Sequence, residues 1–178
     1  MDRRENAHWA VEMSMAKMMI LPIIDRCGGC RECETVCSWA HNMGVINPRR
    51  GRITVVKNEA EGIYIPVMCQ QCEKPYCMKV CPTGAIVEDS ETGVKRIQED
   101  VCIGCKMCIL ACPFGGVAFD PDKGKAVKCD LCYGIGEPQC VKWCPKSVLN
   151  YIDEERMGSV KRGISTEKLM AMLCKKLE

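Results

Sequence analysis

The sequence predicts an α+β protein in which short strands and short helices surround densely spaced cysteines. Seventeen of the 178 residues are cysteine, whereas only 5% are aromatic. Sixteen of the cysteines fall into four similar groups, and short apolar segments with polar, glycine-containing turns lie between the groups. So few aromatic side chains leave the interior to be filled by something else, and the spacing of the cysteines indicates what it is.

The four cysteine groups share one spacing. Each opens with two cysteines separated by two residues and closes with two separated by three, so only the middle gap varies. Proline follows the last cysteine in three groups, whereas Ser38 follows it in the first, and Cys174 stands outside the pattern. The groups are Cys27, Cys30, Cys33, Cys37; Cys69, Cys72, Cys77, Cys81; Cys102, Cys105, Cys108, Cys112; and Cys129, Cys132, Cys140, Cys144.

This spacing indicates four [4Fe–4S] clusters. Closely spaced thiolates can each bind a different iron of one cubane, and in two-cluster ferredoxins the fourth cysteine of the C-x2-C-x2-C-x3-C-P run binds the neighbouring cluster. Cys108 and Cys112 are one helical turn apart, and Pro113 then ends the helix. A missing side chain in these loops lets backbone N–H groups approach cluster sulfur. The glycines expected to do so are Gly28, Gly29 and Gly104.

Zinc is the competing metal. Zinc sites also use C-x2-C pairs, but two such pairs are usually separated by a dozen or more residues. Here the third and fourth cysteines follow almost at once, and no histidine lies among them. A zinc-stabilised scaffold without redox function is the alternative from a different functional class.

The composition of the chain indicates which partners and which cellular compartment to expect. The net charge is +2 without a long basic run, and with few aromatic residues for base stacking no nucleic-acid partner is expected. The longest apolar run, residues 18–24, is too short for a transmembrane segment, and no secretory signal is evident. Because thiols stay reduced in the cytoplasm and there serve as metal ligands, a cytoplasmic protein is expected.

Segments outside the cysteine groups predict the strands. MMILPII (residues 18–24) is typical of a strand, which Pro22 confines to a sheet edge. RITVV and IYIPV, between the first and second groups, are predicted to pair. The segments 85–97 and 116–128 each have apolar ends around a polar turn with glycine, which is the pattern of a hairpin. SVLNYI (147–152) predicts a last strand.

The C-terminal residues predict a helix. STEKLMAMLCKKLE (residues 165–178) follows a polar linker, and Ser165 or Thr166 would serve as N-cap. An apolar stripe recurs at helical spacing, formed by Leu169, Met172, Leu173 and Leu177. Such a stripe usually packs on its own domain, with docking to another protein as the less favoured interpretation.

The residues around the cysteines carry a family resemblance. CQQCEKPYCMKVCPTGAI and KCDLCYGIGEPQCVKWCP are close to the second and fourth motifs of the four-cluster, ferredoxin-like electron-transfer subunits of molybdenum and tungsten oxidoreductases. RCGGCRECETVC followed by NPRRGRITVV looks most like the small subunits of tungsten aldehyde oxidoreductase-type enzymes. The iron–sulfur subunit of the ATP-independent (class II) benzoyl-CoA reductase is one of these. The resemblance covers roughly residues 18–152.

The resemblance implies tandem ferredoxin-like modules, one inserted in the other. The outer module would comprise residues 1–68 and 113–152, the inner module residues 69–112, and an amphipathic helix would occupy the tail, residues 153–178. Within each module the two groups would exchange fourth cysteines, the first group with the fourth and the second with the third, although the spacing alone equally permits exchange between the first and second groups. The implied ligand sets are Cys27, Cys30, Cys33, Cys144; Cys129, Cys132, Cys140, Cys37; Cys69, Cys72, Cys77, Cys112; and Cys102, Cys105, Cys108, Cys81.

The resemblance also implies the function. Four clusters would relay single electrons to or from a large tungsten- or molybdenum-pterin catalytic subunit, with a further electron donor or acceptor protein at the other end. No catalytic constellation is recognisable, and His8 and His41 are expected on the surface or behind the ligands. Alternatives are a free soluble polyferredoxin, or the corresponding subunit of a hydrogenase, carbon monoxide dehydrogenase or formate dehydrogenase.

Overall fold

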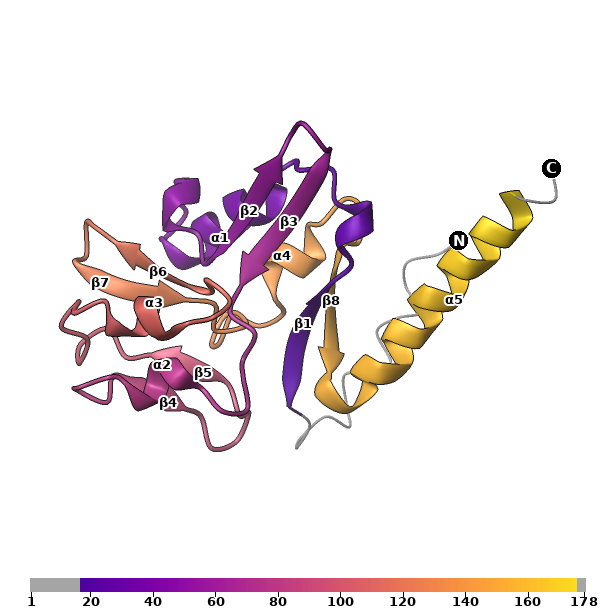
Figure 1. The fold of residues 1–178 in the computed structure, drawn as a ribbon. Helices are drawn as coiled ribbons and strands as arrows, with labels where there is room; N and C mark the ends of the chain where they lie inside the picture. The colour runs from indigo at the N-terminus through magenta and orange to yellow at the C-terminus, as the bar shows by residue number, and fades with distance from the viewer. Residues whose placement is uncertain (1–16, 176–178) are drawn as a thin grey trace.

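Four small antiparallel sheets carry the part of the chain that the structure describes. The structure is a computed structural model that describes residues 17–175. Each sheet has two strands, and short helices and loops connect the sheets (Figure 1). The pairs are β1 (Met18–Pro22) with β8 (Leu149–Asp153), β2 (Ile53–Asn58) with β3 (Ile63–Met68), β4 (Ile86–Glu88) with β5 (Lys95–Ile97), and β6 (Val117–Asp120) with β7 (Lys125–Lys128).

The three local strand pairs agree with the sequence. The pairing of β2 with β3 confirms the strands expected between the first and second groups. The β4–β5 and β6–β7 hairpins confirm the turns expected in segments 85–97 and 116–128. Gly93 and Gly124 have positive φ angles of 66° and 65° in these two turns, a conformation that glycine adopts without steric cost.

The fourth strand pair joins the two ends of the described chain. β1 runs antiparallel to β8, and Pro22 lies at the end of the pairing opposite Leu149. Ile20 and Leu149 are buried in the hydrophobic core that also contains cysteines of the first and fourth groups. This long-range pair therefore brings the first and fourth groups into one packing unit.

A helix begins one residue before the third cysteine of each group and contains that cysteine. The helices are α1 (Glu32–His41), α2 (Tyr76–Lys79), α3 (Met107–Ala111) and α4 (Gln139–Lys142). In three groups the helix ends before the fourth cysteine, as expected where proline comes next, because proline disfavours helical geometry in the residue before it. The helix of the first group instead continues through Cys37 to His41.

Ser38 explains why the first helix is longer. Its side chain is fully buried, where it accepts a hydrogen bond from Asn47 N (2.8 Å) and donates one to Val45 O (3.3 Å). Asn42 Nδ2 donates to the Ser38 carbonyl oxygen (2.8 Å). Ser38 therefore allows α1 to continue, and its hydrogen bonds hold the following loop in place. This loop leads through the short 3-10 turn η3 (Pro48–Arg50) into β2.

Two hydrophobic cores lie in the described part of the chain. The first contains Cys33, Cys37, Cys129 and Cys140 from the first and fourth groups, and the second contains Cys108 from the third. Val117 and Ala126 of the β6–β7 hairpin belong to the second core. This hairpin therefore packs with the second and third groups, although the family resemblance implies that residues 113–152 belong to the outer module. The division into modules itself stays a prediction.

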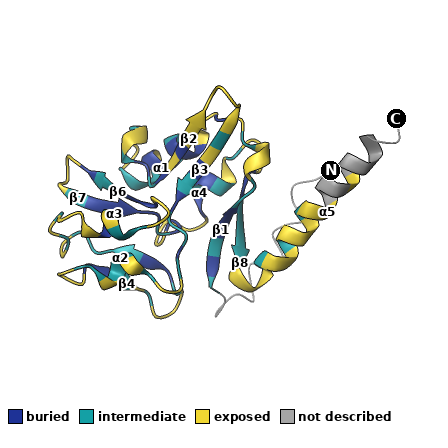
Figure 2. Cartoon of the chain, viewed as in Figure 1, coloured by how far each residue is buried: buried dark blue, intermediate teal, exposed yellow. Residues whose placement is uncertain are grey.

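The last helix, α5 (Met157–Lys175), extends away from the rest of the protein (Figure 1). The expected start at Ser165 or Thr166 is wrong: Thr166 Oγ1 donates to Arg162 O (2.9 Å) inside the helix. The 3-10 turn η4 (Glu154–Arg156) leads directly into α5, with the Asp153 side chain accepting from Glu155 N (2.9 Å). Most of the described side chains of α5 are exposed (Figure 2).

Parts of the predicted tail lie outside the described residues. The side chains of the expected stripe (Leu169, Met172, Leu173, Leu177) and of Cys174 are among them. In the described range, no helix is both long enough and apolar enough to cross a lipid bilayer.

The Ser38→Ala substitution tests the role of this side chain. It leaves the Asn47 amide and the Val45 carbonyl without their buried partner, which should lower the free energy of unfolding by about 1–3 kcal/mol. Guanidinium denaturation of the anaerobic cluster-containing protein, followed by helical circular dichroism, should show the loss. Thr35→Ala in the same helix removes only an exposed hydrogen bond to Arg31 O and should change stability by no more than about 0.5 kcal/mol. Equal effects of the two substitutions would contradict the assignment.

Candidate metal centres

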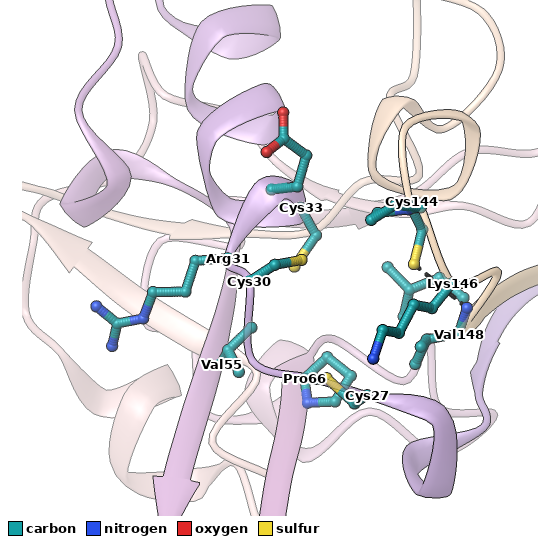
Figure 3. Close-up of a pocket in the computed structure, with 13 residues that line it drawn as sticks. Cys27, Cys30, Arg31, Cys33, Val55, Pro66, Cys144, Lys146 and Val148 are labelled. Atoms are coloured by element: carbon teal, nitrogen blue, oxygen red, sulfur yellow. Dashed lines mark hydrogen bonds between the residues drawn. The ribbon is translucent and has the colours of Figure 1, made fainter.

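Four thiols from opposite ends of the sequence line one cavity. Figure 3 shows them around a shared space whose wall includes Val55, Pro66 and Val148, with Lys146 beside it. Gly28 also lines this cavity. The thiols belong to Cys27, Cys30, Cys33 and Cys144. Three cysteines of the first group are thus combined with the last cysteine of the fourth.

A second cavity repeats this combination within the middle groups. Its apolar wall includes Ile86, Ile97 and Ala126. The thiols that line it belong to Cys102, Cys105, Cys108 and Cys81. Three cysteines of the third group are thus combined with the last cysteine of the second.

The remaining eight grouped cysteines are neighbours in the same crossed manner. Burial raises the pKa of Cys140, and the negative charges of Cys129, Cys37 and Cys132 raise it further. Burial likewise raises the pKa of Cys72, with Cys69 and Cys112 adding to the effect. Cys77 has the same two neighbours, Cys69 and Cys112. Fourth-position cysteines of the first and third groups are therefore within electrostatic range of thiols of the fourth and second groups.

The thiols fit a polynuclear iron–sulfur cofactor. Burial raises the pKa of Cys33 to about 12 and that of Cys37 to about 11, so these thiols would keep their protons without a metal. Iron binding replaces the proton and stabilises the thiolate. Within residues 17–175 no three Cys, His, Asp or Glu side chains are close enough to hold a single metal ion, and the thiols instead surround wider spaces. Four thiols around an apolar cavity are the donor set of a [4Fe–4S] cluster.

Backbone N–H groups donate to several cysteine sulfurs in a repeated pattern. Two of the bonds come from the residue two positions after a first cysteine, and two come from the residue four positions after a fourth cysteine. Such bonds stabilise thiolates and influence the reduction potential of the cluster that they hold. They run from Gln71 N to Cys69 Sγ (3.4 Å), Leu131 N to Cys129 Sγ (3.5 Å), Gly116 N to Cys112 Sγ (3.4 Å) and Val148 N to Cys144 Sγ (3.2 Å).

The fourth cysteine of the first group takes its hydrogen bond from farther along the chain. Arg52 N donates to Cys37 Sγ (3.2 Å), and the Arg52 guanidinium group forms an ion pair with Asp130. The side chain of His41 is buried beside this site, with Nε2 at 3.7 Å from both Cys132 Sγ and Asp130 Oδ1. Burial lowers the pKa of His41 to about 4. His41 is thus a buried neighbour of a ligand cysteine, whereas His8 lies outside the described residues.

Two of the predicted cofactor-binding glycines have a clear conformational role. Gly29 and Gly104 have φ angles of 66° and 69°. A Cβ at Gly29 would lie 2.5 Å from the Tyr64 ring, and a Cβ at Gly104 would meet the Gly124 carbonyl oxygen. Both positions therefore require glycine for the path of the loop itself, and their contact with a cluster stays a prediction.

Sequence reasoning missed the polar residues that support the cysteines. Arg52 was visible only as part of a local basic stretch, and Asp130 only as the residue after Cys129. The sequence places Lys128 directly before that cysteine, but it does not show that the lysine is buried at 3% exposure. Burial of a charged side chain is decided by long-range packing, so no local signal marked these residues.

Comparison with known proteins assigns the chain to a class and a family. Its donor sets are those of an iron–sulfur electron-transfer protein with four [4Fe–4S] clusters. The family model for the 4Fe-4S dicluster domain matches residues 60–154, a range that holds three of the four cysteine groups. The chain belongs to the 4Fe-4S dicluster domain family.

Similar proteins include subunits of oxidoreductases. The polyferredoxin-like subunit of aliphatic sulfonate oxidoreductase from Pyrococcus furiosus is 41% identical over 72% of this chain and 72% of its own length. The B subunit of anaerobic dimethyl sulfoxide reductase from Haemophilus influenzae is 35% identical over 74% of this chain and 73% of its own length. A polypeptide of the benzoyl coenzyme A reductase active site complex BamBC is 31% identical with a TM-score of 0.49, covering 77% of this chain and 76% of its own.

Metal analysis tests the identity of the cofactor. Protein purified without oxygen should contain iron and acid-labile sulfide equivalent to about four [4Fe–4S] clusters, as required by four four-thiolate sites. It should show the broad visible absorption of iron–sulfur clusters and contain little zinc, with iron, sulfide and zinc quantified on the same sample. Stoichiometric zinc in place of iron would contradict the assignment and favour the zinc-stabilised scaffold.

Proposed function

We propose that this chain relays single electrons between a tungsten- or molybdenum-pterin catalytic subunit and a further electron donor or acceptor protein. The observation that carries the proposal is the arrangement of four thiol sites as a connected series. The relatives from Pyrococcus and Haemophilus are both named as parts of oxidoreductases, which supports a role inside a larger enzyme. Dense reduced cysteines suit a cytoplasmic location.

The proposal assigns each cluster three cysteines of one group and the fourth cysteine of another. The two cavities support this exchange directly, because each is lined by such a crossed set. The electrostatic neighbours of Cys72, Cys77 and Cys140 support it for the other two sites. We name the sites by their first cysteine: the Cys27, Cys129, Cys69 and Cys102 sites.

The thiols also indicate the order of the four sites. Cys33 of the Cys27 site is close enough to Cys140 of the Cys129 site to raise its pKa. The Cys129 thiol feels the charge of Cys69 in the same way, and burial is again the main cause of its raised pKa. Cys108 of the Cys102 site has Cys77 of the Cys69 site among the groups that raise its pKa. The series therefore runs from the Cys27 site through the Cys129 and Cys69 sites to the Cys102 site.

Exposed apolar side chains support a bound subunit over a free polyferredoxin. Trp39, Met43, Val45 and Ile46 are all more than half exposed and lie in α1 and the loop that follows it. Exposed apolar side chains grouped in this way are typical of protein interaction sites. This group lies close to the Cys37 ligand in the chain, so a partner that covers it would approach the cluster of the Cys129 site.

The native complex provides the test of this function. The tagged chain, purified without oxygen from its own cells, should elute in size-exclusion chromatography with a larger subunit. Elemental analysis of that fraction should show tungsten or molybdenum in proportion to the larger protein. Elution of the chain alone, with its clusters intact and neither metal present, would favour the free polyferredoxin. A co-eluting nickel protein would instead favour the hydrogenase or carbon monoxide dehydrogenase alternative.

Paired cysteine substitutions test the exchanged ligands. Cys112→Ala and Cys69→Ala should each perturb or remove one cluster, and the double variant should lose no more than the worse single variant, because both residues hold the same cluster. The Cys102→Ala/Cys112→Ala variant should affect two clusters. Iron content and electron paramagnetic resonance of the reduced proteins measure the losses.

Cys174→Ala is the control for these variants, because it leaves all sixteen grouped cysteines in place and should retain about four clusters. If instead Cys102 and Cys112 behaved as ligands of one cluster, each group would hold its own cluster and the exchange would be wrong.

A further inference from the structure

A buried lysine lies at the junction between the Cys129 and Cys69 sites. Lys128 is the last residue of β7, and only 3% of it is exposed. Its Nζ donates to the carbonyl oxygens of Lys95 and Cys129, the latter at 3.1 Å. Both acceptors are neutral, so these bonds satisfy two of the three N–H donors of the ammonium group without balancing its charge.

Gln71 binds the same two carbonyl groups from the other side of the junction. Its Nε2 donates to Cys129 O (2.9 Å) and Lys95 O (3.3 Å), and its Oε1 accepts from Lys95 N (2.8 Å). The Gln71 backbone N–H donates to Cys69 Sγ (3.4 Å). Gln71 and Lys128 therefore join the loop that begins with Cys69 to the loop that begins with Cys129.

The charge of Lys128 has no carboxylate partner within residues 17–175. Lys95 provides the contrast, because it is buried at 1% exposure but its Nζ forms an ion pair with Glu88 Oε1 (2.8 Å). Burial of an unpaired ammonium group is strongly unfavourable, and a buried charge normally has a counter-charge nearby. Among residues 17–175, the negative group that would balance Lys128 is therefore not a carboxylate.

Lys128 Nζ shares its two carbonyl acceptors with Gln71, whose backbone N–H donates to Cys69 Sγ, so the ammonium group lies beside the loop that begins with Cys69. A cluster bound in the Cys69 site would supply the negative charge. A [4Fe–4S] cluster with four thiolates is anionic and becomes more negative by one charge on reduction. A nearby fixed cation stabilises the reduced form more than the oxidised form, and the reduction potential of such a cluster depends on the surrounding charge.

We propose that Lys128 is a fixed cation that raises the reduction potential of the cluster in the Cys69 site, and that Gln71 holds it at the junction with the Cys129 site. The inference rests on the proposed ligand exchange, because that exchange defines which cysteines hold the cluster of the Cys69 site. It adds to the relay a specific place where an arriving electron is stabilised, in the middle of the series. It also explains why a lysine is buried beside a neutral amide rather than beside an acid.

Lys128→Met tests the charge, because methionine keeps an unbranched apolar side chain and removes the ammonium group. Redox titration of the anaerobic protein, followed by electron paramagnetic resonance, measures the midpoint potentials. In Lys128→Met one midpoint should shift to lower potential, whereas Lys128→Arg should keep it near the wild-type value. Lys95→Met, which removes a buried lysine already paired with Glu88, is the matched control and should leave the midpoints in place. Unchanged midpoints in Lys128→Met with full iron content would overturn the inference.

A second variant keeps the inference testable if Lys128→Met fails to retain its cluster. Gln71→Glu keeps the lysine but places a carboxylate beside it, so the same midpoint should fall because the ammonium charge is neutralised. An unchanged midpoint in that variant would also overturn the inference.

The cluster whose midpoint potential shifts shows whether this inference or the proposed ligand exchange has failed. The signal that shifts should be the one that Cys112→Ala alters. A shift in a different signal would show that Lys128 acts on a cluster while the ligand exchange is wrong. The midpoints are measured on the isolated chain, so they do not depend on the identity of the catalytic partner.

Discussion

Bonds between buried thiolates and iron are the interaction on which the rest of this protein depends. Cysteines occupy places in both hydrophobic cores that large aliphatic side chains would otherwise fill. Burial raises the pKa of Cys33 and Cys37 far above the physiological range, so the folded chain without metal would hold neutral thiols around its cavities. The metal stabilises the thiolates that the fold brings together. The free energy of cluster binding therefore contributes directly to the free energy of folding.

The crossed arrangement of thiols links segments that are far apart in the sequence. Cys144 lines a cavity with cysteines of the first group, and the β1–β8 pair holds the same two regions together through the backbone. Cys81 lines the other cavity with cysteines of the third group. Each cavity therefore depends on contacts that form only when distant segments have come together, which explains why two-stranded sheets suffice as a scaffold.

Buried polar side chains connect the parts of this scaffold. Ser38 fastens the loop after α1, and Arg52 at the end of that loop reaches both Cys37 and Asp130. Gln71 and Lys128 join the loops of the Cys69 and Cys129 sites through shared carbonyl groups. Polar groups buried with satisfied hydrogen bonds favour one arrangement over its alternatives, because a shifted arrangement would leave them without partners. The spacing between neighbouring clusters, on which electron transfer depends, is thus held by directional bonds.

The sequence by itself determined the features that depend on local spacing. The cysteine pattern indicated the cofactor, and alternating apolar residues around glycine turns predicted the β4–β5 and β6–β7 hairpins, because both signals are contained within a few neighbouring residues. Pro113, after the fourth cysteine of the third group, predicted where α3 ends. These interactions form between neighbours in the chain, so they could be inferred without the tertiary structure.

The tertiary structure decided the rest. It placed His41 and Lys128 in the interior, packed β6 and β7 with the second and third groups, and started α5 at Met157 rather than at Ser165. It also showed that Ser38 replaces proline to fasten a loop that returns to Cys37. These features depend on which distant segments meet, because burial and long-range hydrogen bonds belong to the assembled fold and have no signature in the local sequence.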